Sequence, residues 1–129
     1  MDAGLARATE LVGEFAGRPA YGLPDEALRV GLVGLHRLAS LATAAAASLA
    51  NEARGRELPR RDEAASTVTW LRDLLRIAPP EARQLMALGD LIESRPGIAA
   101  AIGAGALNSS QALAIGHALA AVPDDEPAL

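Results

Sequence analysis

The chain has 129 residues, and two residue types, 30 alanines and 20 leucines, dominate it. It has 12 arginines, no lysine and no cysteine, and its formal net charge is −4. The lack of cysteine excludes disulfides and thiolate metal sites, and the two histidines, His36 and His117, lie too far apart for a local metal motif. The acidic balance argues against a protein that coats nucleic acid without sequence preference.

Alanine and leucine favour helices, and the residue types that favour strands are scarce. We therefore expect an all-α fold of about six helices in an orthogonal bundle. One helical domain is expected over residues 1–123, followed by an acidic disordered tail over 124–129. A cytoplasmic protein without a membrane span is expected, because polar side chains such as His36 and Arg37 interrupt the apolar segment 30–50.

The N-terminal part predicts a short helix over 5–16, a loop over 18–23 and a long helix over 24–54. Apolar residues recur along the long helix at alternating steps of four and three: Leu28, Leu32, Leu35, Ala39, Ala42, Ala46, Leu49 and Ala53. Such heptad spacing indicates that the helix packs antiparallel to neighbours in its own chain or pairs with a second copy. In a homodimer, the seam would contain Leu28, Leu32, Leu35, Ala39, Ala42 and Leu49.

The second half of the chain predicts shorter helices. A basic connector over 55–62 precedes a helix over 67–77, which Ser66 caps. Its expected buried face contains Trp70, Leu71, Leu74 and Leu75. A break at Pro79 and Pro80 opens a helix that ends near residue 93, and closing helices follow over 96–122. The last one begins at Asn108, which forms an approximate capping box with Gln111.

Residues 66–93 have the form of a helix-turn-helix, a short helix, a tight break and a second amphipathic helix. In the DNA-binding interpretation, Arg83 and Gln84 read bases in double-stranded DNA. The expected phosphate contacts are Arg54, Arg56, Arg60, Arg61 and Arg76. The segment 54–83 holds seven arginines against five acids, a net charge of +2. An ordinary helical hairpin fits the same spacing, and a homodimer is expected if DNA is bound, because one copy would bind weakly.

No group of residues in the sequence has the spacing of a catalytic or metal site. The acidic pairs lack a neighbouring histidine, and the glycines of the segment 103–105 have neither the strand nor the lysine of a phosphate loop. We therefore expect no enzyme activity, cofactor, metal or small-molecule substrate. The alternative to DNA binding is an oligomerisation or protein-interaction domain that works through the long helix.

Several motifs resemble a known family. Trp70-Leu71, Pro80-Glu81-Ala82-Arg83, the segment 91–96 and the segment 105–112 (GALNSSQA) are similar to the N-terminal domain of the actinobacterial 13E12 repeat family, domain of unknown function 222. The resemblance implies a DNA-targeting module, which in longer members precedes an HNH endonuclease domain. The clustered histidines of an HNH site are missing here, so the resemblance does not imply nuclease activity. The same segment more weakly resembles ParB-type partition proteins, from which it departs at Arg76, where a glycine is usual.

Overall fold

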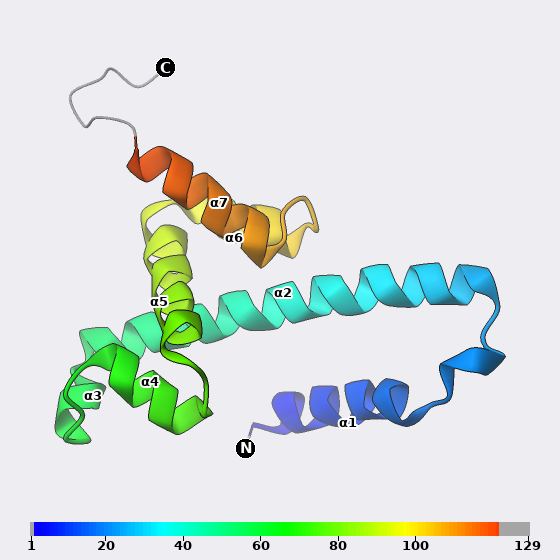
Figure 1. The fold of residues 1–129 in the computed structure, drawn as a ribbon, viewed down its shortest axis with the longest axis horizontal. Coiled ribbons are helices and arrows are strands. Elements are labelled where there is room, and N and C mark those ends of the chain that lie inside the picture. Colours follow the sequence, from blue (N-terminus) through cyan, green and yellow to red (C-terminus); the bar gives the residue numbers. More distant parts are fainter. Residues whose placement is uncertain (1, 122–129) are drawn as a thin grey trace. The chain divides into compact units, whose positions relative to one another are not determined.

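The computed structural model describes residues 2–121, and the predicted tail over 124–129 lies outside them. Within these residues the fold is all-α, as predicted, with seven helices and no strand (Figure 1). The helices are α1 (Ala3–Gly17), α2 (Asp25–Gly55), α3 (Leu58–Arg61), α4 (Thr67–Leu75), α5 (Pro79–Ser94), α6 (Pro96–Gly103) and α7 (Ser109–Ala120). A single 3-10 turn, η1 (Ala20–Gly22), lies in the predicted loop between α1 and α2.

The chain divides into two compact units, Met1–Gly34 and Leu35–Leu129, and the expected single domain over residues 1–123 stays a prediction. Unit 1 contains α1, η1 and the start of α2, and unit 2 contains the remainder of α2 and the helices that follow. In unit 1, none of the residues of α1 is buried.

Helix α1 is locally well formed although it is unburied. The carboxylate of Asp2 caps it by accepting hydrogen bonds from the backbone N–H groups of Gly4 and Leu5, at 2.7 and 3.2 Å. At its other end, the guanidinium of Arg18 lies 5.2 Å from the centroid of the Phe15 ring. Local interactions therefore define α1 at both ends.

Helix α2 spans 31 residues, within one residue of the predicted bounds at each end. Asp25 and Glu26 lie in its first turn, where negative charge favours the helix dipole. Among the described residues it is the one helix that is long and apolar enough to cross a membrane, on length and composition alone. Its buried residues are Ser40, Ala47 and Ala50, so its second half is a core helix of unit 2.

The core of unit 2 is built around α5, which lies across α2 and contacts α4, α6 and α7 (Figure 1). One buried cluster joins α2 and α5 to α6 and α7, and the other joins α2 and α5 to α4. The first contains Ala47, Leu88, Ile102 and Ala112, and the second contains Ala50, Leu71, Ala82 and Met86. Leu85 packs against both clusters, which makes α5 the central helix of the unit.

The closest approach of α5 to α2 occurs at Gly89. A Cβ atom on Gly89 would lie 2.7 Å from the carbonyl oxygen of Ala47 and 3.3 Å from the Cβ atom of Asn51. No side chain fits at that distance from a backbone oxygen, so glycine is required at this crossing. Alanine at position 47 on the facing helix permits the same close approach.

The helix ends in unit 2 agree with several sequence predictions. The hydroxyl of Ser66 accepts a hydrogen bond from the N–H of Thr69, and Asn108 and Gln111 form a complete capping box. Arg76 ends α4 in the left-handed conformation, with φ of 57°, at the position where the resemblance to partition proteins expects glycine. The predicted short helix and the helix that follows it within residues 66–93 are therefore present, as α4 and α5.

Two local predictions are wrong. The connector over 55–62 contains a helical turn, α3, because Glu57 adopts a left-handed conformation and the following Pro59 is buried. On α4, Leu71 is buried but Leu74 and Leu75 are exposed. Trp70 is only half-buried, and its indole N–H donates to Asp62 at 3.0 Å. Helix α4 contacts α3 and α5 within the unit, so only part of its apolar face is covered.

Candidate interaction surface

Helix α2 carries the predicted apolar stripe and, on another face, a stripe of small and polar side chains, and the other helices of unit 2 pack on the second stripe. The core-facing stripe is Ser40, Ala44, Ala47 and Asn51, again at steps of four and three. Ser40 is buried, and its hydroxyl accepts a hydrogen bond from the backbone N–H of Ser109 at 3.3 Å. The small side chains on this face allow α5 to lie close to α2 at Gly89.

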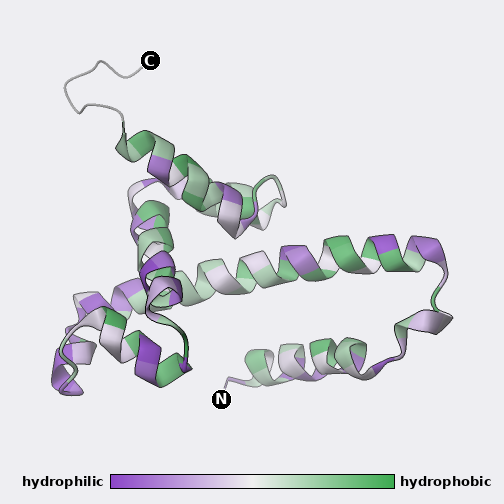
Figure 2. Cartoon of the chain, viewed as in Figure 1, coloured by the Kyte–Doolittle hydropathy of each residue, from purple (hydrophilic) through white to green (hydrophobic). Residues whose placement is uncertain are grey.

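The predicted seam is the other stripe, and it is open. All six residues of the predicted dimer seam are exposed: Leu28, Leu32, Leu35, Ala39, Ala42 and Leu49. The exposed fraction reaches 72% at Leu32 and 70% at Leu49. Figure 2 shows hydrophobic residues along α1 and along the length of α2. The expectation of neighbours in the same chain and the expectation of a second copy both stay predictions.

A groove runs beside the open stripe in unit 2. It holds a pocket of about 400 Å³ that is lined by Ala42 and Ala46 of α2, Leu85 of α5 and Leu113 of α7, with Glu81 and Gln84 among its polar residues. A second, almost wholly apolar hollow of about 220 Å³ shares Ala46 and Leu85 and adds Leu49, Leu74 and Leu75. The groove was not predicted from the sequence, because Leu74 and Leu75 were expected to lie in the core. The local sequence carried no signal for this exposure, because Leu71, Leu74 and Leu75 have the i, i+3, i+4 spacing of a core-facing helix stripe.

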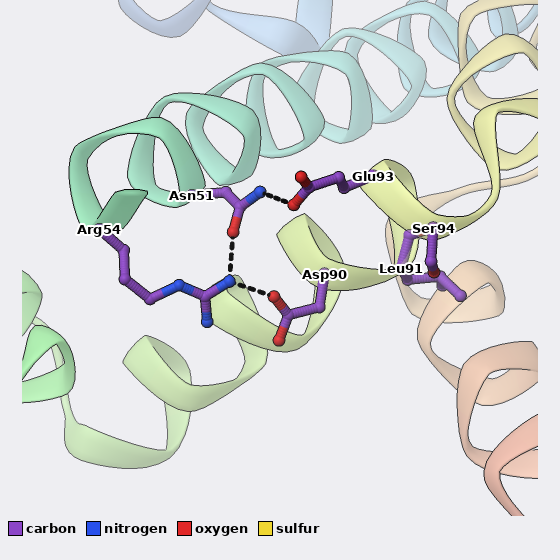
Figure 3. Close-up of polar contacts among 6 residues, drawn as sticks. All are labelled: Asn51, Arg54, Asp90, Leu91, Glu93 and Ser94. Carbon is purple, nitrogen blue, oxygen red and sulfur yellow. Dashed lines mark hydrogen bonds and ion pairs between the residues drawn. The ribbon is translucent and has the colours of Figure 1, made fainter. Parts of the chain in front are cut away.

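A polar cluster ties the end of α2 to α5 (Figure 3). The guanidinium of Arg54 donates to Asp90 and to the side-chain oxygen of Asn51, and the amide of Asn51 donates to Glu93. The hydrogen bond to Asp90, with the negative charges of Asp90 and Glu93, raises the pKa of Arg54 against the opposing effect of partial burial. Arg54, a predicted phosphate contact, is thus committed to contacts within the chain.

The other predicted phosphate contacts fall into two groups. Arg56 pairs with Glu52 at 3.0 Å, and Arg60 lies 3.7 Å from Glu57. Arg61 and Arg76 form no ion pair with any other residue of the described chain. All four side chains are exposed, so the structure leaves two of the five arginines unengaged.

The predicted base-reading residues lie at the start of α5. Arg83 is exposed and forms no ion pair within residues 2–121, whereas Gln84 lies on the wall of the groove beside Glu81. The whole helix has one arginine against three acids, a net charge of −2. That charge opposes the approach of α5 to a phosphate backbone.

Among residues 2–121, the remaining polar side chains form no cluster with evident chemistry. No group of three histidine, aspartate or glutamate side chains in the described chain could hold a metal ion. His36 is exposed on α2, and His117 lines a shallow hollow between α5 and α7 together with Asp90. The open apolar stripe with its groove is therefore the feature that most needs a functional explanation.

No family model, curated protein or solved structure matches the chain. The resemblance to the 13E12 repeat family thus rests on the motif residues themselves. In the structure these residues lie at helix starts and core contacts. Leu71 and Ala82 are buried between α4 and α5, and Asn108 caps α7.

Proposed function

We propose that the chain is a helical homodimerisation module, and that the open stripe of α2 with the adjoining groove is its contact surface. The observation that carries the proposal is the exposure of leucines at heptad spacing along a helix whose other face already packs in a core. A contiguous exposed apolar surface of this kind is typical of interaction sites. Heptad spacing specifies a second helix as the partner.

The test compares two neighbouring substitutions with matched exposure. Leu32 lies on the stripe and is 72% exposed, and Val33 lies off the stripe and is 71% exposed. We expect wild type to be dimeric by sedimentation equilibrium between about 1 μM and about 1 mM. Leu32→Asp should weaken the dimer at least about 100-fold, since each copy loses roughly 1.4 kcal/mol or more and symmetry doubles the loss.

The control Val33→Asp should leave the dimer unchanged, because its side chain points away from the stripe. Both side chains are already exposed, so neither substitution should unfold the chain, and far-UV circular dichroism, which reports the helices of both units, checks this. A wild-type chain that stays monomeric throughout this range, or one equally sensitive to both substitutions, overturns the proposal.

A membrane is the competing occupant for an exposed apolar helix of this length. The proposal of a cytoplasmic dimer expects no sedimentation with vesicles of neutral lipid. Two polar contacts in the middle of α2 favour the dimer, because they hold this helix to other parts of unit 2: Arg37 donates to the Gly103 carbonyl at 2.7 Å, and Ser40 accepts from the backbone N–H of Ser109. Vesicle binding by a monomer, lost in Leu32→Asp, would replace the dimer with a membrane function.

DNA binding by the helix-turn-helix-like pair α4–α5 is a second candidate function. The specific observation in its favour is that Arg61, Arg76 and Arg83, three exposed arginines of the basic segment, form no ion pair in the described chain. In this proposal they meet phosphate and base edges, and Gln84 assists Arg83. The resemblance to the 13E12 repeat family, whose membership we propose on the motif residues alone, suggests the same DNA-targeting role without enzyme activity.

Fluorescence anisotropy with duplex DNA at about 50 mM and about 200 mM salt tests this candidate. Arg83→Ala should weaken binding, and Arg95→Ala is the matched control, an exposed arginine without an ion pair at the junction of α5 and α6. The DNA-binding proposal is contradicted if the affinity for DNA does not change with salt concentration, or if Arg83→Ala and Arg95→Ala change it equally.

A further inference from the structure

A segment of low helix propensity lies inside α2, at the end of unit 1. Residues 30–34 have the sequence VGLVG, and Gly34 is the last residue of unit 1. Relative to alanine, valine disfavours a helix, and each glycine lowers the helix equilibrium constant by about four- to fivefold. Residues 44–48 of the same helix have the sequence AAAAS. We infer that residues 30–34 are a joint, at which α2 opens or bends while the units on either side stay folded.

Packing does not compensate for the poor propensity of the joint. Val30, Leu32 and Val33 are 63%, 72% and 71% exposed. A β-branched side chain in a helix recovers its cost when it is buried, and most of the stability of a helix in a protein comes from the packing of its apolar face. A segment whose large side chains are mainly exposed therefore keeps little beyond its own weak propensity.

The two glycines of the joint are not required by any close contact. A Cβ atom on Gly31 or on Gly34 would have no atom of the described chain within 4 Å beyond its own helical turns. Gly89 differs, because a Cβ atom there would lie 2.7 Å from a backbone oxygen. Glycines that weaken a helix without a packing reason are typical of points where the backbone changes direction.

Contacts strengthen α2 on both sides of the joint. Before it, Arg29 pairs with Glu26 at 3.2 Å, and after it, Arg37 donates to the carbonyl of Gly103 at 2.7 Å. The joint itself contains only apolar side chains, which can form neither kind of contact. Local opening should therefore concentrate at the joint, and unit 1 can change its direction without disturbing the core of unit 2. This inference goes beyond the proposed dimerisation and does not depend on it.

The chain has no cysteine, so introduced cysteines can carry spin labels on either side of the joint. Asp25→Cys with Ser48→Cys spans the joint, and a rigid helix would separate these positions by about 35 Å. His36→Cys with Glu52→Cys is the control, because both exposed positions follow the joint in the same helix. Double electron–electron resonance is measured after dilution of about tenfold into unlabelled chain, so that only distances within one copy contribute. We expect the spanning pair to give a distribution at least about twice as wide as the control pair, extended toward shorter distances.

Alanine at both glycines should straighten the joint. Gly31→Ala with Gly34→Ala shifts the local helix equilibrium by roughly 15- to 25-fold, so the spanning pair should narrow to the width of the control pair. Gly13→Ala is the matched control, because Gly13 lies inside α1 and its Cβ atom would also meet nothing within 4 Å. This control should leave the distribution of the spanning pair unchanged.

The proposed dimer would cover Leu28 and Leu32 and so hold the joint straight. The spanning pair is therefore also measured with Leu49→Asp, which weakens that dimer from outside the joint. A wide distribution in either background that narrows with the two alanines supports the joint. A narrow distribution near the rigid-helix distance in both backgrounds, or a wide one that the two alanines leave unchanged, overturns it.

Discussion

The crossing of α5 over α2 at Gly89 gives the sharpest prediction for stability. Gly89→Ala adds one methyl group, which would lie 2.7 Å from the carbonyl oxygen of Ala47. That oxygen belongs to the backbone of a 31-residue helix, so it cannot move aside as a flexible side chain could. The two helices must separate by several tenths of an ångström, which loosens the buried clusters on both sides of the crossing.

The change in the free energy of unfolding caused by Gly89→Ala is the difference between two opposing effects. Alanine in place of glycine inside a helix stabilises by about 0.5 to 1 kcal/mol. Forcing an extra methyl group into a packed contact costs about 1 to 3 kcal/mol. The net loss should be roughly 1 to 2 kcal/mol, which corresponds to a fall in Tm of roughly 5 to 15 °C for a unit of this size.

Gly116→Ala is the matched control. Gly116 also lies inside a helix of unit 2, but its nearest neighbour is the Cδ2 atom of Leu91 at 3.2 Å, the far end of a flexible side chain. The free energy of unfolding of the Gly116→Ala variant should exceed that of wild type by no more than about 1 kcal/mol. Thermal unfolding followed by the fluorescence of Trp70, the sole tryptophan, reports on unit 2 for both variants. If Gly89→Ala were as stable as wild type, the close crossing would be refuted.

The remaining predictions concern single contacts. Asn108→Ala should cost about 1 kcal/mol by removing the capping box of α7, with exposed Ser110→Ala close to neutral, and urea unfolding measures both. A double-mutant cycle of Arg54→Gln and Asp90→Asn should give a coupling of only about 0.2 to 1 kcal/mol, because the two side chains are 42% and 55% exposed. Because folding raises the pKa of Arg54, the contribution of its contacts to the free energy of unfolding is complete below the ordinary pKa range of arginine. This contribution is lost only as the pH rises through the higher pKa of the folded chain. The cost of Arg54→Gln should therefore be equal at about pH 6 and about pH 9, and a difference would contradict the assignment.

Local signals in the sequence predicted the helices well. The bounds of α2, the cap at Ser66 and the capping box of α7 depend on residues that are adjacent in the chain, and all three are confirmed. The face of α2 that enters the core was not predictable in this way. Periodicity selects the most apolar stripe, whereas the core selects the stripe whose small side chains allow α5 to approach at Gly89. That choice depends on a helix more than 30 residues further along the chain.

The distribution of leucine and alanine on α2 argues that its open stripe serves an interaction. A helix that needed only to stabilise its own unit would gain most by placing leucines toward the core and small or polar residues outside. Here Ala44 and Ala47 face the core, while Leu32 and Leu49 are about 70% exposed. Exposed leucines at heptad spacing add nothing to the stability of a monomer and promote association.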